Sequence, residues 1–320
     1  DRLGGGAMSR RTALPALDWF RLAAAFLVVC NHTSPLDSLS QGADLWLTRV
    51  LARVAVPFFL MVSGYFLAQK DWTGTGKLIR KSLCVYIGAV VLYLPLNWYS
   101  GSFSSLGDFL KSLLVDGTMY HLWYFPAVIL GAAIARNLAR LPAAAALALA
   151  GILYLMGLLG DSYYGFTASV PQLKVLYDGI FTLCSYTRNG LFFAPLFLLL
   201  GAAGLRWSRP VSAVGFVLSL AAMSWEGVFL HRLGLPRHDS MYLLLPVCMV
   251  LLFSLLLGAN RGQDPRARRI SLWLYLLHPW SIVLVRGGAK VLGLEGLFIE
   301  NSLGHFCAVL LLTLGTALGI

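Results

Sequence analysis

Two polar side chains inside the first apolar segment of the chain, Arg21 and His32, are candidates for chemistry. A histidine can act as a general base near neutral pH, and an arginine can bind an anion. In an α-helix their spacing amounts to about 20° beyond three turns and about 16 Å along the axis, so we expect both on one face. Asp18 lies one turn before Arg21. The alternative is structural, with Asp18 and Arg21 as an ion pair and His32 at the membrane surface.

A second polar pattern lies near the end of the chain, where Ser271, Tyr275 and His278 are spaced as one stripe on a helix. We expect this stripe to face a polar passage, and hydrogen bonding between helices is the alternative role. His121 and Trp123 begin another apolar segment. They are candidates for the same site or for interfacial anchors in an aromatic belt.

Charged residues near the ends of apolar segments need partners, because burial of a charge in lipid is costly. Arg53 and Glu226 each lie about five residues inside the end of an apolar segment, if these segments form membrane-spanning helices. We expect them to neutralise each other or to flank a substrate site, and Glu226 is a candidate for orienting His32. Arg188, just before another apolar segment, is a candidate for binding a carboxylate.

The composition that surrounds these residues is typical of a membrane protein, with 58% hydrophobic and 12% charged residues. Soluble domains carry about 25% charged residues. Apolar runs of membrane-spanning length recur along the whole chain, which predicts an all-α polytopic protein with ten transmembrane helices and no soluble domain between them. The predicted spans are 17–34, 49–68, 78–99, 121–136, 142–159, 190–205, 211–231, 241–259, 270–286 and 302–320. A short interfacial helix is expected within 103–115.

The distribution of charge predicts the orientation. In the ten-span arrangement the side of both termini carries sixteen Lys and Arg against four Asp, and the other side carries nine against ten acidic residues. Lys and Arg gather in cytoplasmic loops, so both termini are predicted to be cytoplasmic. Topology thus accounts for the net charge of +11. This excludes a nucleic-acid partner and leaves the lipid bilayer as the expected surroundings.

Other motifs carry no function. The five cysteines are dispersed without a metal-binding spacing, so no metal is expected. The segment Gly74-Thr75-Gly76-Lys77 lacks the frame of a phosphate-binding loop. Residues 1–7 are interpreted as a cloning remnant before Met8, which leaves one transmembrane domain over residues 8–320.

Four elements, taken in order, resemble acyltransferase family three, the ten-helix membrane acyltransferases. They are Asp18-Trp-Phe-Arg21 through Asn31-His32-Thr33, Arg53-Val-Ala-Val-Pro57-Phe-Phe-Leu-Met-Val-Ser63-Gly64, His121-Leu-Trp123, and Ser271-Leu-Trp-Leu-Tyr275-Leu-Leu-His278-Pro279. Within this family, the segments 31–35 and 188–193 most resemble the membrane half of the serine/alanine racemases of glycopeptide (vancomycin) resistance. That subgroup carries a cytoplasmic pyridoxal-phosphate racemase, so a fused or partner racemase domain is expected.

The resemblance implies an enzyme of a bacterial cytoplasmic membrane that moves an acyl group, usually acetyl from acetyl-CoA, to an extracytoplasmic hydroxyl or amino group. It makes His32 the leading catalytic residue, with Arg21 and His278 beside it. The residues implied to bind CoA are Arg21, Lys70, Lys77, Arg80, Lys81, Ser271 and Tyr275. Those implied to bind a small-molecule or cell-envelope acceptor are Arg53, His121, Trp123, Arg188 and Glu226. For the loop cations, ordinary anchoring at the cytoplasmic face is the alternative.

The resemblance also supports an alternative function, transport or sensing of serine or alanine for an attached racemase. Transporters commonly consist of two similar halves with interrupted helices at matching positions, and the sequence has no such symmetry. A purely structural anchor would leave the shared face of Arg21 and His32 unexplained.

Overall fold

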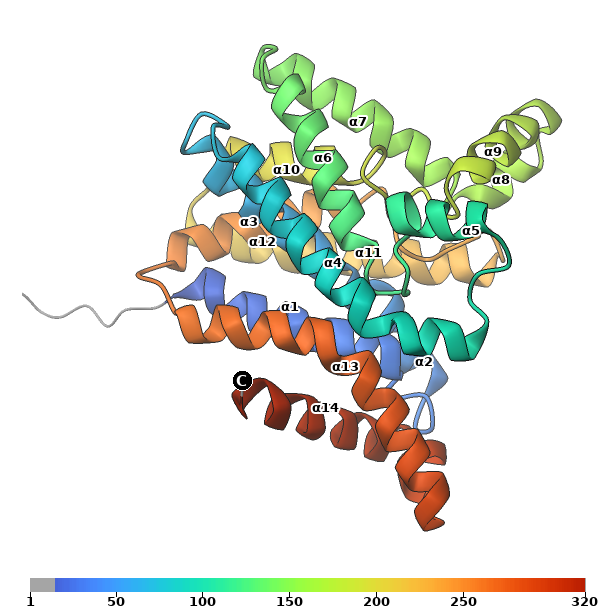
Figure 1. Ribbon diagram of the computed structural model, residues 1–320. Coiled ribbons are helices and arrows are strands. Elements are labelled where there is room, and N and C mark those ends of the chain that lie inside the picture. Colours follow the sequence, from blue (N-terminus) through green and yellow to red (C-terminus); the bar gives the residue numbers. More distant parts are fainter. Residues whose placement is uncertain (1–14, 320) are drawn as a thin grey trace, which may run out of the picture.

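The computed structural model describes residues 15–319, and this part of the chain is helical without a strand (Figure 1). The interpretation of residues 1–7 and of Met8 lies outside the described residues. In chain order the α-helices are α1 (Ala16–Thr33), α2 (Gln41–Leu45), α3 (Ala55–Ala68), α4 (Thr75–Ser100), α5 (Leu106–Lys111), α6 (Tyr124–Leu138), α7 (Ala143–Leu159), α8 (Tyr164–Ala168), α9 (Pro171–Leu183), α10 (Ala194–Ala203), α11 (Arg209–Arg232), α12 (Leu245–Ala259), α13 (Pro265–Leu292) and α14 (Ser302–Gly319).

The all-helical prediction is confirmed, and each predicted span contains one of the longer helices. By length and composition, five helical stretches of the described chain can cross a membrane. They are Gln41–Ala68, which continues from α2 through a π-helical turn (Trp46–Val50) and a 3₁₀ turn (Leu51–Val54) into α3, together with α4, α11, α13 and α14. Helices α6, α7, α10 and α12 are apolar but shorter. The count of ten crossings stays a prediction.

The two long connections contain more helix than the sequence alone predicted. The expected short helix in 103–115 is α5, which continues into a π-helical turn (Ser112–Asp116). In the connection 160–189, α8 and α9 were not predicted. Gln172, Lys174 and Asp178 interrupt the apolar residues of α9, and a helix on a protein surface needs only one apolar stripe rather than a continuous apolar run.

Helix α1 packs against α13, and α13 in turn against α14, so the two ends of the chain form one side of the molecule (Figure 1). The second half of α13 bends away from α1. Pro279 lies inside this helix, and a proline there removes a backbone hydrogen bond and kinks the helix.

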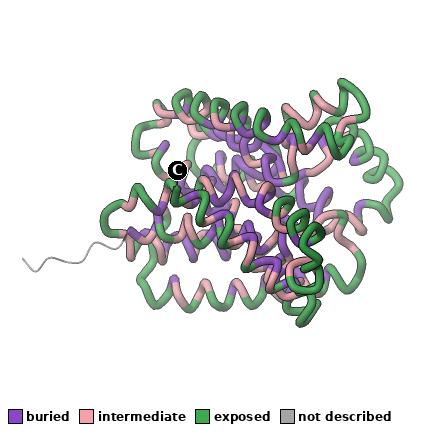
Figure 2. The backbone as a smooth tube through the Cα atoms, turned by 60° about the horizontal axis from the view of Figure 1, so that its bottom comes forward, coloured by how far each residue is buried: buried purple, intermediate pink, exposed green. Residues whose placement is uncertain are grey.

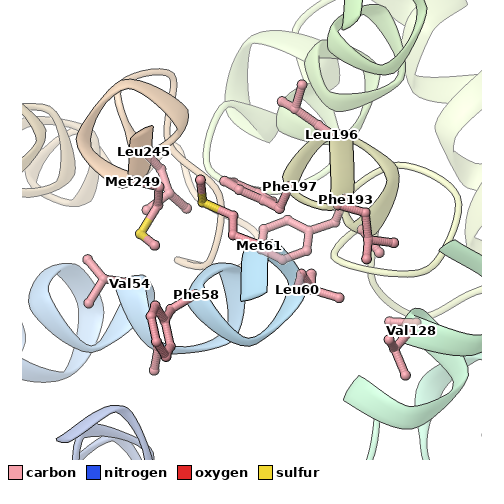
Figure 3. Packing of buried hydrophobic residues seen from close by; sticks show 14 of the residues in the cluster. Val54, Phe58, Leu60, Met61, Val128, Phe193, Leu196, Phe197, Leu245 and Met249 are labelled. Atoms are coloured by element: carbon pink, nitrogen blue, oxygen red, sulfur yellow. The ribbon is translucent and has the colours of Figure 1, made fainter. Parts of the chain in front are cut away.

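Helices α3 and α10 make the most extensive contact in the described chain. Their backbones approach so closely that a Cβ atom added at Gly64 would overlap the backbone of Leu198, and one at Gly201 would overlap the backbone of Met61. Small residues permit such close helix packing. Figure 3 shows the adjoining core, where side chains of α3 meet those of α10 and α12.

The outer faces of several helices remain apolar. Figure 2 shows buried residues concentrated in the interior and exposed residues along the periphery. Large exposed hydrophobic side chains follow α4 and α11 in particular: Leu83, Ile87, Val91, Leu94, Val211, Val214, Val217, Leu218 and Trp225. Apolar surface of this extent is what a lipid environment would cover.

Candidate active site

Three histidines from separate parts of the chain lie side by side. The rings of His32 in α1 and His278 in α13 are stacked, with centroids 5.3 Å apart. The ring of His121, just before α6, lies 5.2 Å from that of His278. On its other side, His32 contacts the ring of Tyr120 at 4.5 Å. The structure therefore brings together three of the predicted site residues.

Pro279 determines the proton position on His278. Because Pro279 has no N–H, the carbonyl of Tyr275 one turn earlier lacks its usual helical donor. The Nδ1 atom of His278 lies 2.9 Å from that carbonyl oxygen and 3.2 Å from the carbonyl of Leu274. A carbonyl only accepts hydrogen bonds, so Nδ1 is the donor and neutral His278 presents a lone pair at Nε2. This Nε2 atom is buried and has no hydrogen-bond partner among the described residues.

His121 is 1% exposed, and neither of its ring nitrogens has a hydrogen-bond partner in the described chain. Its position is held by its backbone, because the hydroxyl of Tyr275 donates to the carbonyl oxygen of His121. Buried polar atoms normally have partners, and those without one mark places where a water or ligand belongs.

His32 and His121 line a cavity that we call the histidine cavity. Its wider part has a volume of about 400 Å³ and is lined by Asn31, His32, Arg49, Arg53, Tyr120, Tyr186, Arg188, His238, Ile282 and Arg286. A narrow extension of about 40 Å³ shares His32, Arg53 and Arg188 with this part and reaches His121, Trp123 and Tyr275.

A second cavity of about 140 Å³, the Arg21 cavity, is lined by Arg21, Phe59, Tyr124, Phe125, Ser271, Leu272 and Tyr275. Tyr275 thus lines both the Arg21 cavity and the narrow extension of the histidine cavity, whose wall also contains His32. Arg21 and His32, which the sequence places on one face of α1, accordingly line two cavities that share Tyr275 in their walls.

Asp18 holds Arg21 in place. Its Oδ1 atom lies 3.3 Å from Nη1 of Arg21, and its Oδ2 atom accepts a 2.7 Å hydrogen bond from the backbone N–H of Asp264. The Nε atom of Arg268 pairs with the same carboxylate at 3.4 Å. The predicted pair of Asp18 and Arg21 is therefore present, and Arg268 is a partner that sequence reasoning missed because it lies 250 residues away.

The predicted loop cations are not part of either cavity. Lys70, Lys77, Arg80 and Lys81 are exposed at the end of α3 and the start of α4, and none of them lines the histidine cavity or the Arg21 cavity.

Glu226 has a structural role. Its carboxylate accepts hydrogen bonds from the backbone N–H groups of Leu243 at 2.6 Å and Leu244 at 3.0 Å, and from the hydroxyl of Tyr163 at 2.8 Å. It therefore satisfies amides at the start of α12, where helices favour negative charge. The expectation that Glu226 neutralises Arg53 is wrong, since no ion pair joins these two described residues. It lines neither cavity.

Trp123 and Tyr186 hold the guanidinium of Arg188. The Cζ atom of Arg188 lies 4.7 Å from the ring centroid of Trp123 and 4.9 Å from that of Tyr186, distances typical of cation–π contacts. The side-chain oxygen of Asn189 accepts from the backbone N–H of Leu191 at 2.9 Å, which fixes the loop that carries Arg188. The candidate residues Trp123 and Arg188 thus act as one unit in the wall of the cavity.

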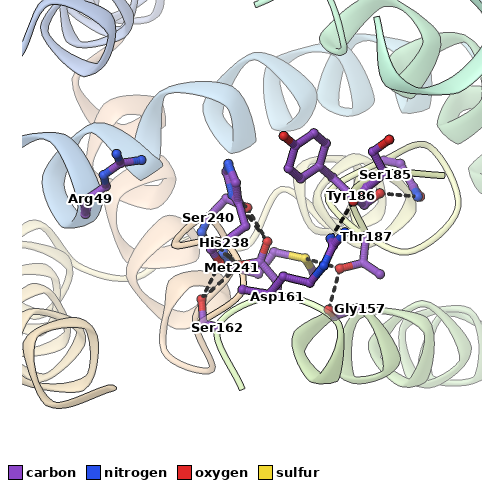
Figure 4. A network of polar contacts seen from close by, with 12 residues as sticks. Arg49, Gly157, Asp161, Ser162, Ser185, Tyr186, Thr187, His238, Ser240 and Met241 are labelled. Carbon is purple, nitrogen blue, oxygen red and sulfur yellow. Dashed lines mark hydrogen bonds and ion pairs between the residues drawn. The ribbon is translucent and has the colours of Figure 1, made fainter. Parts of the chain in front are cut away.

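A polar network around Asp161, which sequence reasoning missed, shapes the same wall (Figure 4). The Oδ1 atom of Asp161 accepts from the backbone N–H groups of Ser240 and Met241, both at 2.9 Å. Its Oδ2 atom accepts from the Ser240 hydroxyl at 2.5 Å and lies 3.6 Å from Nδ1 of His238. A single acid after an apolar segment was the only signal in the sequence.

Both titratable groups of this loop network have shifted pKa values. Burial would raise the pKa of Asp161, but hydrogen bonds and charge from His238, with hydrogen bonds from Ser240, lower the pKa of the carboxyl overall. Burial lowers the pKa of His238 to about 4, against the opposing influence of Asp161. Near neutral pH the pair therefore consists of a carboxylate and a neutral imidazole.

The site combines an imidazole open to a cavity, two further buried imidazoles and several guanidinium groups. Such a set can bind an anionic or polar substrate and remove a proton from it. No group of three or more His, Cys, Asp or Glu residues suited to a metal ion occurs in the part of the chain that is described.

Comparisons with known proteins agree with the motifs. The chain is 40% identical over 313 residues to an "Amino-acid racemase" of Enterococcus faecalis, which covers 94% of this chain and 44% of that protein. It is 38% identical over 316 residues to a "Serine/alanine racemase" of Enterococcus gallinarum, which covers 93% of this chain and 45% of that protein. The chain thus spans less than half the length of these relatives.

No solved structure shows a significant match to the chain. The sequence model of one protein family, described as an acyltransferase domain, matches residues 14–320. Since this match extends over nearly all of the sequence and the four motifs lie within it, the chain belongs to acyltransferase family three.

Proposed function

We propose that the protein transfers an acyl group, in particular acetyl, from acyl-CoA in the cytoplasm to a hydroxyl or amino group on the other side of a bacterial cytoplasmic membrane. In this proposal the chain crosses the membrane ten times with both termini in the cytoplasm. The observation that carries it is the pair of cavities that meet at Tyr275, one with Arg21 and the other with His32. Donor and acceptor can thus approach from opposite sides.

The basic residues support the proposed direction of transfer. Asn260, before α13, accepts from the backbone N–H of Leu17 at 3.1 Å, and Figure 1 shows the α3–α4 and α12–α13 connections at the end where α1 begins. Arg21 and the cations Lys70, Lys77, Arg80 and Lys81 belong to this end. There they would attract the phosphates of CoA, with Arg21, Ser271 and Tyr275 beside its thioester arm.

In the proposed reaction, His32 removes the proton from the acceptor hydroxyl as its oxygen attacks the thioester carbon. The carbon–sulfur bond then breaks, and protonated His32 returns the proton to the departing thiolate, so the products are an ester and free CoA. His32 suits this role because its ring lies on the cavity wall, whereas the stacked His278 is buried behind it. His278 and His121 are then positioning residues in this site.

The test is transfer across a vesicle membrane. The protein is reconstituted with the basic ends of its helices facing the lumen, acetyl-CoA is enclosed, and candidate acceptors are supplied outside. We expect acetylated product outside, none with His32→Ala, and normal product with the control His231→Ala, whose exposed ring pairs with Asp239 and with no other acid in the described chain. Arg21→Ala should weaken CoA binding, while His32→Ala should remove turnover but retain binding. No CoA binding by active, folded protein would contradict the proposal.

The names of the relatives favour one second candidate. Proteins named as racemases contain a region similar to this chain together with further sequence of comparable length. The membrane half could accordingly deliver or sense serine or alanine for a fused or partner racemase. Saturable serine uptake without acetyl-CoA, unaffected by His32→Ala, would establish this alternative and overturn acyl transfer.

A further inference from the structure

The histidine cavity has a one-sided charge. Four arginines line it, namely Arg49, Arg53, Arg188 and Arg286, and no Asp or Glu is among its described lining residues. The nearby Asp161 carboxylate is already occupied by Ser240, Met241 and His238. The cavity is therefore suited to a ligand with negative charge.

Arg53 has a buried guanidinium group without a partner in the described chain. Its side chain is only 9% exposed, yet its Nε and Nη2 atoms have no hydrogen-bond partner among the described residues. No acid pairs with it in the described chain. A buried guanidinium without a counter-ion is strongly unfavourable, so an anion in the cavity would complete its environment.

Arg188 adds a second, oriented cation. Its guanidinium is held by the rings of Trp123 and Tyr186. Contacts of this kind use the faces of the guanidinium plane, so its N–H groups remain available at the edge. Its Nε atom also lacks a partner within the described residues. Arg53 and Arg188 line both parts of the histidine cavity together with His32.

We propose that the acceptor is an anionic alcohol, in which a carboxylate or phosphate group accompanies the hydroxyl that becomes acylated. The anionic group binds Arg53 and Arg188, and the hydroxyl lies at His32. This inference rests on the proposed acyl transfer and narrows its substrate class. Because none of the described residues that line the cavity carries a carboxylate to receive an ammonium group, a free zwitterionic amino acid should bind less well than the hydroxy acid of similar size.

The experiment compares four small acceptors with protein in neutral phosphatidylcholine nanodiscs, which contain no competing anionic lipid. Glycerate carries a carboxylate, glycerol 3-phosphate a phosphate, glycerol no charge, and serine both charges. Binding is measured by calorimetry and acetyl transfer by kcat/KM. We expect glycerate or glycerol 3-phosphate to exceed glycerol by about 100-fold in kcat/KM, a typical effect of pairing a buried charge. The preference between these two anions identifies carboxylate or phosphate as the natural group.

Variants test whether Arg53 causes the preference. Arg53→Met should bring the anions to the level of glycerol, and Arg53→Lys should retain part of the preference because it keeps the charge but loses the planar fork. Arg232→Gln, an exposed charge at the end of α11 without a described partner, is the matched control and should leave the preference unchanged. Melting curves verify that each variant is folded.

The outcomes separate this inference from the proposed function. Efficient acetylation of glycerol with no dependence on Arg53 would overturn the anionic acceptor and leave acyl transfer intact. Arg53-dependent binding of glycerate without any acetyl transfer would support the anion site and overturn the acyltransferase proposal. Serine binding as tight as that of glycerate would contradict the charge argument.

Discussion

Replacement of Asp161 tests whether one buried carboxylate holds the loop between α11 and α12 in place. The carboxylate is 1% exposed and accepts from two backbone N–H groups, of Ser240 and Met241, as well as from the Ser240 hydroxyl. Asp161→Ala would leave the Met241 amide without an acceptor and the Ser240 amide with only the carbonyl oxygen of His238, 3.1 Å away. Each lost hydrogen bond to the buried carboxylate costs about 1–3 kcal/mol, so loss of the two amide bonds should lower the free energy of unfolding by about 2–6 kcal/mol.

Asp161→Asn should cost less, about 1–2 kcal/mol, because the amide oxygen can still accept from both backbone N–H groups, and only the charge assistance and the hydrogen bond that the Ser240 hydroxyl donates are lost. The matched control is Asp178→Ala. Asp178 accepts a 2.6 Å hydrogen bond from Lys174, but both side chains are about half exposed. An exposed pair of this kind contributes at most about 1 kcal/mol.

The assay is equilibrium unfolding of the three variants and the wild type in one mixed-micelle system, followed by tryptophan fluorescence. Acceptor binding provides a second readout, because His238 and Ser240 line the histidine cavity. If Asp161→Ala and Asp178→Ala lower the free energy of unfolding by the same amount, the buried network does not support the loop and the reasoning fails.

Three further predictions concern packing, pH and helix capping. Gly64→Ala should destabilise the fold by about 2 kcal/mol or more, because the added Cβ overlaps α10. Gly88→Ala should not destabilise it in this way, because no atom lies within 4 Å of the added Cβ. Thermal melting of both variants checks this. Between pH 6.5 and about 4 the unfolded chain binds a proton at His238 that the folded chain does not, so acidification over this range should lower the free energy of unfolding by about 3 kcal/mol. Unfolding measured as a function of pH checks this, and His238→Gln should remove this part of the pH dependence. The lowered pKa of Asp161 adds a further loss only below its ordinary value of 3.8. Glu226→Gln should lower the free energy of unfolding by about 1–3 kcal/mol, because this carboxylate caps α12. Acceptor affinity, measured by calorimetry, should stay unchanged, because Glu226 does not line the cavity. A selective loss of affinity would refute the capping role.

The helices of the core could be predicted because their apolar runs are continuous in the sequence, and a helix lies in every predicted segment. Helices α8 and α9 could not be found in this way. The first is one short turn, and the second alternates apolar and polar residues, so neither produces a run of membrane length. Local periodicity determines helices only where one periodic pattern extends over several turns.

Part of the site was also predictable. The common face of Arg21 and His32 follows from helical geometry alone. The free carbonyl beside Pro279 follows from the missing proline N–H, and His278 uses it. In both cases the two groups lie within a few turns of one helix, where their spacing determines their relative direction.

The sequence by itself therefore determined the helical, apolar character of the chain and the residues on each helix face. Only the tertiary structure decided which faces meet. It brings His32, His121 and His278 together from three distant segments, and it pairs Asp161 with a loop 79 residues later. It also directs Glu226 to the start of α12 rather than to Arg53. The physical reason is that a buried polar group takes the partner that helix packing brings within hydrogen-bonding distance, and spacing along one helix does not specify the partner on another.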